Sequence, residues 1–503
     1  GNTTGYQNVA VGRASMESNT TGNLNVAVGQ HALLLNTTGT QNVAVGALAL
    51  DQNTTGGSNT ATGYNALGNN TTGEQNVGIG HETLDANTTG SQNTAIGRSA
   101  LTANSTGEKN TACGNRALKS LTEGDFNTAV GRGALESCTT ASNNTAVGYL
   151  CLEDVTTGTN NTAIGSNTGK TQTTANGCTW VGNEAGRVNT ASDNVGIGSG
   201  ALYANTSGTF NVAVGTSQYG VSQGPLGANT TGNFNTALGN KALLANTTAS
   251  GNTAIGSSAM ISNTTGHSNV AVGSTALDAN TTGQDLVAVG YNALGANTTA
   301  NDNVAVGTSA LGSNTTGGNN TGIGRLALFS NTTGASNVAV GAQALDACTT
   351  GSGNIAIGFE AGTDLTTCDG LTAVGHRAGA NVTTGEDNTT IGLVAGFEIT
   401  TGTNNLCLGS QSGRSTSPSG NITTHSNIVC LGDNNIANLF CADTSISSSD
   451  SRDKTDIADF TKGLAWIEAL RPVTYRWDRR TWYGTDAEPF GTPDGSKKRQ
   501  KLH

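Results

Sequence analysis

The sequence predicts an all-β protein whose main part is a β-roll or β-solenoid shaft of stacked coils. Three observations carry this prediction: a 17-residue repeat, an apolar fraction made mostly of alanine and valine, and abundant glycine. Glycine fills 72 of 503 positions, whereas aromatic residues make up 4 % and charged residues 11 %. An enzyme of this length would bury many large side chains in thick cores, so the composition argues against one.

One repeat unit is the segment NTTGASNVAVGAQALDA, residues 331–347. Its Asn-Val-Ala-Val run is β-prone, and we expect Val338 and Val340 to point to one side and Ala339 to the other. Gly341 permits a sharp turn, the Ala-Leu pair that follows is expected to form a second short strand, and Asn-Thr-Thr-Gly closes the coil. Two strands and two turns describe one coil of a solenoid.

The 17-residue register runs through residues 1–414. One unit is a residue short (189–205), and another is seven residues too long (205–229), which predicts a bump at 216–228. At about 4.8 Å per coil, roughly 24 coils would form a rod on the order of 115 Å long. The register continues where the opening asparagine is replaced, at Leu121, Cys138, Val155, Gln172, Leu365, Val382 and Ile399.

A coil this short encloses little more than one line of side chains, so we expect that it cannot shield its own valine and leucine faces. Repeat proteins solve this problem by stacking, and fibres add lateral packing against sister chains. We therefore expect a parallel homotrimer. The repeated NVAVGxxAL pattern resembles the left-handed β-roll heads of trimeric autotransporter adhesins over roughly residues 1–414.

The period fades after residue 414, and residues 415–448 are expected to form a β-rich tip. The next segment begins with Ser-Asp-x-Arg-x-Lys, in which the named residues are Ser449, Asp450, Arg452 and Lys454. An amphipathic helix is predicted after it, because four apolar residues recur at helical spacing. These residues are Phe460, Leu464, Ile467 and Leu470, and the strand pattern Pro472, Val473, Tyr475 and Trp477 follows.

This order of motifs resembles the endosialidase-type intramolecular chaperone, an auto-peptidase at the C-terminus of phage tail fibres. The resemblance implies single-turnover, serine-type cleavage of the Ser448–Ser449 bond, with no activity in the shaft. Ser449 would supply the hydroxyl and a partly neutral Lys454 the base, while Asp450 and Arg452 would support the site. Direct attack or an N-to-O acyl shift, and action within or between chains, both remain open.

Members of that family continue with a Gly-Phe-Ile-Ala-Gln-Glu-like strand and a long helix, whereas this chain stops at Lys501–His503. Residues 449–503 are therefore expected to be the N-terminal part of the chaperone module. The chain also opens in mid-repeat, so we expect a fragment that lacks its N-terminal anchor.

The leading functional hypothesis is a trimeric virion tail fibre that is assembled in the host cytoplasm and binds a host cell-surface receptor, with a glycan as one candidate. A cellular adhesin or secreted fibril, placed outside the cell or on its surface, is the alternative; a shaft attached to an upstream enzyme domain is the third. The shaft has no basic stripe for nucleic acid and no apolar run of about 20 residues for membrane insertion.

The sequence indicates no cofactor and no metal site, because its six histidines show no paired ligand spacing. The nine cysteines are scattered substitutions within the repeat, so they indicate no disulfide framework. The Asn-Thr-Thr segments are also N-glycosylation sequons. Turn chemistry alone explains their period, and the sequence leaves their glycosylation open.

Overall fold

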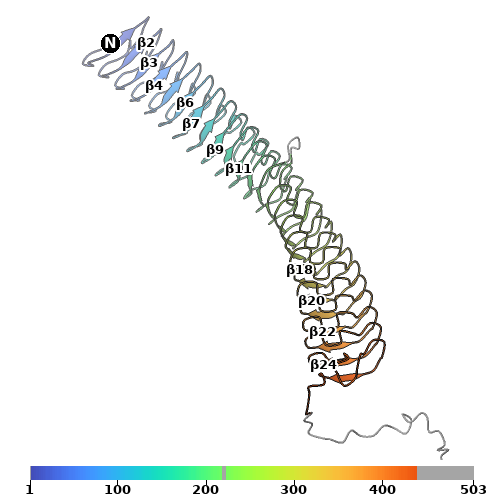
Figure 1. Cartoon of the computed structure of the whole chain (residues 1–503). Helices are drawn as coiled ribbons and strands as arrows, with labels where there is room; N and C mark the ends of the chain where they lie inside the picture. Colours follow the sequence, from blue (N-terminus) through green and yellow to red (C-terminus); the bar gives the residue numbers. More distant parts are fainter. Residues whose placement is uncertain (1, 218–222, 439–503) are drawn as a thin grey trace, which may run out of the picture. The chain divides into compact units, whose positions relative to one another are not determined.

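Stacked coils of nearly equal length form a parallel β-solenoid, which confirms the predicted fold class (Figure 1). The computed structural model describes residues 2–217 and 223–438. Each coil contributes one strand of three residues, and consecutive strands pair in parallel into a single sheet. The described residues contain no helix, and therefore none of the length and apolarity that would cross a membrane.

The strands follow one another along the shaft in chain order. They are β1 (Val9–Val11), β2 (Val26–Val28), β3 (Val43–Val45), β4 (Thr60–Thr62), β5 (Val77–Ile79), β6 (Thr94–Ile96), β7 (Thr111–Cys113), β8 (Thr128–Val130), β9 (Thr145–Val147), β10 (Thr162–Ile164), β11 (Thr179–Val181), β12 (Val195–Ile197) and β13 (Val212–Val214). The remainder are β14 (Thr236–Leu238), β15 (Thr253–Ile255), β16 (Val270–Val272), β17 (Val287–Val289), β18 (Val304–Val306), β19 (Thr321–Ile323), β20 (Val338–Val340), β21 (Ile355–Ile357), β22 (Thr372–Val374), β23 (Thr389–Ile391), β24 (Leu406–Leu408) and β25 (Val429–Leu431).

Side chains alternate across each strand as predicted. In β20, Ala339 is buried, while Val338 and Val340 on either side are partly exposed. The middle residue is buried in every strand from β2 to β25, because it points into the coil and the two flanking residues point outward. The strands therefore contribute one column of residues to the core of the shaft, and most of these residues are alanine.

The prediction of a second strand in each coil is wrong. The Ala-Leu pair lies in a turn, and Leu345 has a φ of 53°, which belongs to the left-handed region rather than to a strand. The Leu345 N–H nevertheless donates to the Ala361 carbonyl of the next coil at 3.0 Å. A left-handed residue costs about 1–2 kcal/mol, and complete burial of a leucine offsets this by about 1.5–3 kcal/mol.

Leucine at this position is buried in each regular coil without help from another chain, as Leu33, Leu101 and Leu345 illustrate. The expectation that a coil leaves both its valine and its leucine unshielded is therefore wrong for leucine. It holds for the outward residues of the strands, since Val338 and Val340 stay partly exposed. The difference arises because the left-handed turn directs the leucine into the coil.

Two ladders of buried asparagine side chains run beside the alanine column. In the first, the opening Asn36 donates from Nδ2 to Asn19 Oδ1 at 2.8 Å and to Gly39 O at 3.0 Å. In the second, Asn25 Oδ1 accepts a hydrogen bond from the Asn42 N–H at 2.9 Å. These amides satisfy one another from coil to coil, and a buried polar group needs such partners.

The first ladder stops where the sequence replaces its asparagine. Asn104 Oδ1 and Asn331 Oδ1 are buried without a hydrogen-bond partner, because Leu121 and Cys348 occupy the next rungs. The Asn-Thr-Thr asparagines from Asn19 onward, Asn36 among them, have their side chains inside the coil, whereas Asn2 is exposed.

The coil with seven extra residues returns to the regular path at Gly224, whose N–H donates to Gly200 O at 2.9 Å. Leu226 then occupies the buried leucine position, so the shaft keeps its core beyond the insertion. A longer coil also separates β24 from β25, and Ile422 fills its opening position. The compact unit that contains the shaft ends at Ala437.

Candidate functional site

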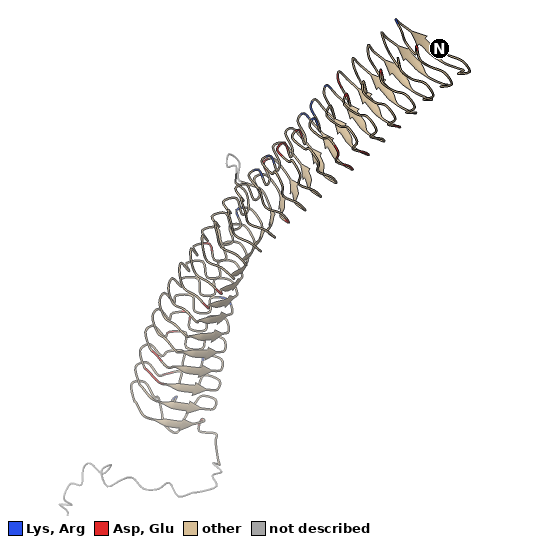
Figure 2. Ribbon diagram, turned by 180° about the vertical axis from the view of Figure 1, so that it is seen from behind, with Lys and Arg blue, Asp and Glu red and all other residues tan. Residues whose placement is uncertain are grey.

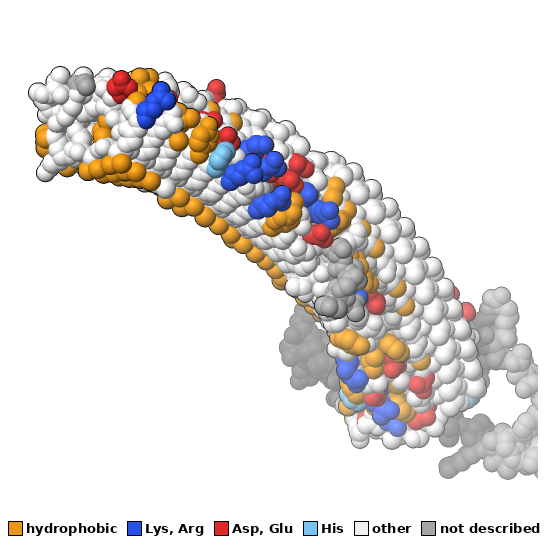
Figure 3. Space-filling view, turned by 90° about the horizontal axis from the view of Figure 1, so that it is seen from above, with side chains coloured by type: hydrophobic (Ala, Val, Ile, Leu, Met, Phe, Trp, Pro, Cys, Tyr) orange, Lys and Arg blue, Asp and Glu red, His pale blue; other side chains and the backbone are white. Residues whose placement is uncertain are grey.

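The outward third residues of the strands form a continuous row that we call the aliphatic stripe. Valine, isoleucine or leucine fills this position in 23 of the 25 strands, and Thr62 and Cys113 are the exceptions. The side chains are partly to substantially exposed: Ile79 and Ile96 each keep 40 % of their surface accessible, and Ile164 keeps 44 %. In Figure 3, hydrophobic side chains follow one edge of the shaft over much of its length.

Soluble monomers rarely expose an apolar patch that extends beyond a few hundred Å². The aliphatic stripe continues from Val11 in β1 to Leu431 in β25, with one residue from every coil. Each strand also presents its first residue on the same side, and this residue is Val, Thr, Ile or Leu. The surface is long and regularly spaced along the stack, which favours side-by-side packing against a partner of the same geometry.

The cysteines of the shaft differ sharply in accessibility. Cys113 lies in the aliphatic stripe and is exposed, whereas the other described cysteines are buried. Burial raises the pKa of the Cys138 and Cys151 thiols to about 12 each, because a thiolate would lose its hydration there. These thiols therefore stay protonated and unreactive at neutral pH, which leaves Cys113 as the accessible thiol of the described shaft.

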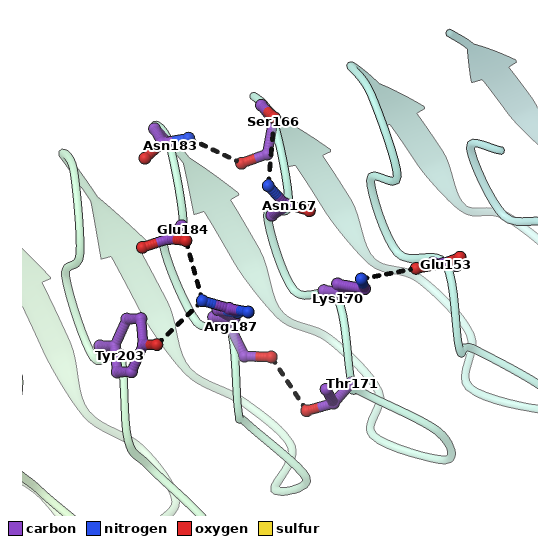
Figure 4. A network of polar contacts seen from close by, with 9 residues as sticks. All are labelled: Glu153, Ser166, Asn167, Lys170, Thr171, Asn183, Glu184, Arg187 and Tyr203. Carbon is purple, nitrogen blue, oxygen red and sulfur yellow. Dashed lines mark hydrogen bonds and ion pairs between the residues drawn. The ribbon is translucent and has the colours of Figure 1, made fainter. Parts of the chain in front are cut away.

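Charged side chains on another face form contacts within a coil and between neighbouring coils (Figure 4). Lys170 pairs with Glu153 at 3.1 Å, and Arg187 pairs with Glu184 at 2.9 Å. The same Arg187 donates to the Tyr203 hydroxyl at 3.0 Å. Exposed ion pairs of this kind contribute about 0–1 kcal/mol each, so they refine the stacking of coils without driving it.

The described shaft contains no group of three or more His, Cys, Asp or Glu side chains arranged to hold a metal ion. Charged residues are sparse along the shaft, as Figure 2 shows: most of the described ribbon is tan, with few blue (Lys, Arg) or red (Asp, Glu) residues. The described shaft therefore offers two kinds of surface for binding: the aliphatic stripe on one side and charged side chains elsewhere.

The residues that the sequence predicts for self-cleavage lie outside the described residues. These are Ser449 and Lys454 as the catalytic pair, Asp450 and Arg452 as supporting residues, and the Ser448–Ser449 bond itself. Their roles remain predictions from the motif.

The comparison with protein families concerns this same segment. Residues 449–498 match the family model described as the chaperone of endosialidase. No curated protein matches the chain. The chain thus combines a parallel β-solenoid shaft with a C-terminal segment similar to the chaperone of endosialidase.

Proposed function

We propose that the protein is a trimeric attachment fibre of a virion, aligned by a C-terminal chaperone segment that cleaves itself away. The aliphatic stripe is the observation that carries the proposal, because it runs through every coil and stays partly exposed in the single chain. Apolar burial stabilises by about 25 cal/mol per Å². Even a modest gain at each coil accumulates over the whole length of the shaft.

A sister chain in the same orientation and register meets the stripe with a surface of identical period. Closed rings of identical chains avoid open-ended growth, and three parallel shafts around one axis would cover each stripe. The match of residues 449–498 to the chaperone of endosialidase supports assembly into trimers. The proposed receptor lies on the surface of the host cell.

Near-identical coils also explain why such a fibre needs a chaperone. A shift of one chain by a single repeat unit would exchange one set of valines for another at little cost. A C-terminal module that associates first would set the register before the shafts pack. Cleavage before Ser449 would then remove the module and leave a fibre that unfolds slowly and cannot reassemble by the same route.

Sedimentation equilibrium of the full chain tests the trimer, and Cys113 tests which face lies at its axis. Cys441, the one cysteine outside the described residues, is first replaced by serine so that it cannot crosslink. Mild oxidation of this variant is then expected to produce disulfide-linked chains through Cys113. The matched control carries Cys113→Ser and Gln92→Cys, which moves the accessible thiol to an exposed position away from the stripe. It is expected to remain uncrosslinked. A monomeric mass, or equal crosslinking of both proteins, would contradict the proposal.

Self-cleavage is tested separately by the mass of the product expressed from the full-length gene. The unaltered protein is expected to yield a product that ends at Ser448, whereas Ser449→Ala should stay intact because it lacks the hydroxyl. Ser447→Ala, two residues away, should cleave like the unaltered protein. Intact mass spectrometry distinguishes these results. If the unaltered protein stays uncut, the proposed self-cleavage is contradicted, whereas the proposed trimer is tested only by sedimentation and crosslinking.

A further inference from the structure

A second surface row lies at the outer position that follows the glycine after each strand. Over six consecutive coils this position holds Tyr64, His81, Arg98, Asn115, Arg132 and Tyr149. The backbone keeps these residues directly above one another: the Glu82 N–H donates to Tyr64 O and the Leu150 N–H donates to Arg132 O, both at 3.0 Å. We call these six residues, with the adjoining Arg116, the arginine–aromatic row.

Aromatic rings lie at both ends of the row and remain accessible. Tyr64 stacks on His81 with ring centroids 5.2 Å apart, and Tyr64 is 49 % exposed. At the other end, the Arg132 guanidinium lies 5.5 Å from the centre of the Tyr149 ring and donates to its hydroxyl at 3.2 Å. Tyr149 is 47 % exposed, so each end offers a preorganised aromatic surface to solvent.

Positive charge gathers between the aromatic ends. Arg98 and Arg132 are exposed, and neither has a carboxylate partner within the described part of the chain. Arg116 pairs with Glu136 at 3.2 Å yet keeps 47 % of its side chain exposed. Basic side chains are rare in the shaft, and Figure 3 shows several of them gathered over one stretch of this face, with acidic and hydrophobic side chains among them.

The geometry points to a binding surface for an acidic polysaccharide along the arginine–aromatic row; this inference rests on the proposed attachment function and names its ligand class. Guanidinium groups form paired hydrogen bonds with carboxylate or sulfate oxygens. Tyrosine faces combine apolar area with a polar edge, which suits the C–H surfaces and hydroxyls of sugars. Adjacent coils are about 4.8 Å apart, a spacing comparable to one sugar residue of an extended chain.

Nucleic acid fits this surface less well. Three arginines, one of them paired with Glu136, neutralise too few phosphates for strong electrostatic binding. Glu82 lies beside His81 at 3.4 Å and adds negative charge to one end. Sparse charges between exposed rings instead match a polymer that carries an occasional anionic group among neutral hydroxyls.

The row would stay accessible in the proposed trimer. The glycine between the aliphatic stripe and this row turns the chain through a corner, as Gly97 does before Arg98 with a φ of 124°. In Figure 3, a band that is neither hydrophobic nor charged separates the hydrophobic edge from the charged cluster. Sister chains packed on the stripe would therefore leave the arginine–aromatic row facing solvent.

Binding of the full chain to immobilised polysaccharides, measured by biolayer interferometry, tests the inference. The probes are alginate for carboxylate groups, dextran sulfate for sulfate groups, unmodified dextran as the neutral control and a short DNA duplex. We expect binding to alginate or dextran sulfate but not to dextran. Replacement of both Arg98 and Arg132 by glutamine should weaken binding roughly tenfold or more, and Tyr149→Ala should also weaken it.

Matched controls come from the same outer position on other coils. Arg325→Gln and Tyr291→Ala alter exposed residues that lack basic and aromatic neighbours in the row, and they should leave binding unchanged. Equal losses in these controls, no binding to either acidic polysaccharide, or tighter binding to DNA would overturn the inference. Sedimentation of each variant separates the two proposals, since a trimer that binds no acidic polysaccharide refutes only this one.

Discussion

Replacing Trp180 by alanine is expected to lower the opening free energy of its coil by about 3–5 kcal/mol, because it leaves a large cavity in the shaft core. Trp180 is fully buried in the middle of β11, where most coils have alanine. Its Nε1–H donates to Gln172 Oε1 at 2.9 Å, so the truncation also removes the partner of a buried amide. Hydrogen exchange, read by mass spectrometry over residues 155–205, measures the loss.

The surrounding glycines show how one coil accepts so large a side chain. Gly169 and Gly186 occupy positions that hold leucine in regular coils, and Gly196 replaces the alanine of the next strand. A Cβ atom on Gly186 would lie 2.5 Å from Trp180 Cδ2, and one on Gly196 would lie 2.7 Å from its Cε3. The tryptophan therefore takes the volume of the missing leucines, and the packing density of the coil is conserved.

This exchange of volume predicts that one substitution has opposite effects in two backgrounds. Gly186→Leu should destabilise the unaltered protein, because its side chain would overlap the Trp180 ring. In the Trp180→Ala background, the same Gly186→Leu should instead restore part of the lost protection. Gly186 already has the left-handed φ, 59°, that leucine adopts in regular coils. Additive effects in the double-mutant cycle would contradict this account.

Other irregular coils follow the same rule on a smaller scale. A Cβ atom on Gly396 would lie 2.4 Å from Thr390 Cγ2, and one on Gly362 would lie 2.9 Å from Leu371 Cδ2. In each case a glycine replaces the leucine near a residue larger than the usual occupant of its position. The exchange is not obligatory, because Leu286 and Leu277 fill the positions equivalent to Leu371 and Gly362 in another coil and both are buried.

The 17-residue period and the alternation in Val338–Val340 were sufficient to predict a solenoid in which valine and alanine point to opposite sides of the strand. The second strand was wrong because a two-residue apolar pair carries no periodicity that separates a strand from a turn. Only the coordinates show that Leu345 takes a left-handed φ and enters the core. The conformation of apolar runs of only two residues is therefore the feature of this repeat that its sequence predicts least reliably.

Of the two proposed functional surfaces, one could be predicted from the sequence and the other was missed. The outward valines predicted an exposed apolar face, and the structure shows that it forms one stripe from Val11 to Leu431. The arginine–aromatic row was missed because its members are each a full repeat apart in the sequence and are not apolar. An alignment of the repeat units would have shown the row, because Arg98 and Arg132 share one position of the repeat with the aromatic residues on either side of them. The motif at Ser449 was recognised from sequence alone, and its geometry remains a prediction.

Gly307→Ala is expected to lower the opening free energy of its coil by about 3 kcal/mol, although it adds a single methyl group. Gly307 follows β18 with a φ of 138°, a conformation that L-residues rarely adopt. The added Cβ would lie 2.5 Å from the carbonyl oxygen of Gly324 in the next coil. Relief of that contact would require the two coils to separate, which would weaken the hydrogen bond from Gly324 N–H to Val306 O, now 2.7 Å.

Gly353→Ala is the matched control, because Gly353 has a φ of 69° and no atom within 4 Å of an added Cβ. Ser336 takes a φ of 60° at the equivalent position, so a side chain is tolerated there. Hydrogen exchange should show protection near Gly307→Ala reduced by on the order of a hundredfold, with little change for Gly353→Ala. Because coils contact only their neighbours, the loss should stay within a few coils of residue 307. Equal losses of protection in both variants would contradict the expected clash between a Cβ at Gly307 and the next coil.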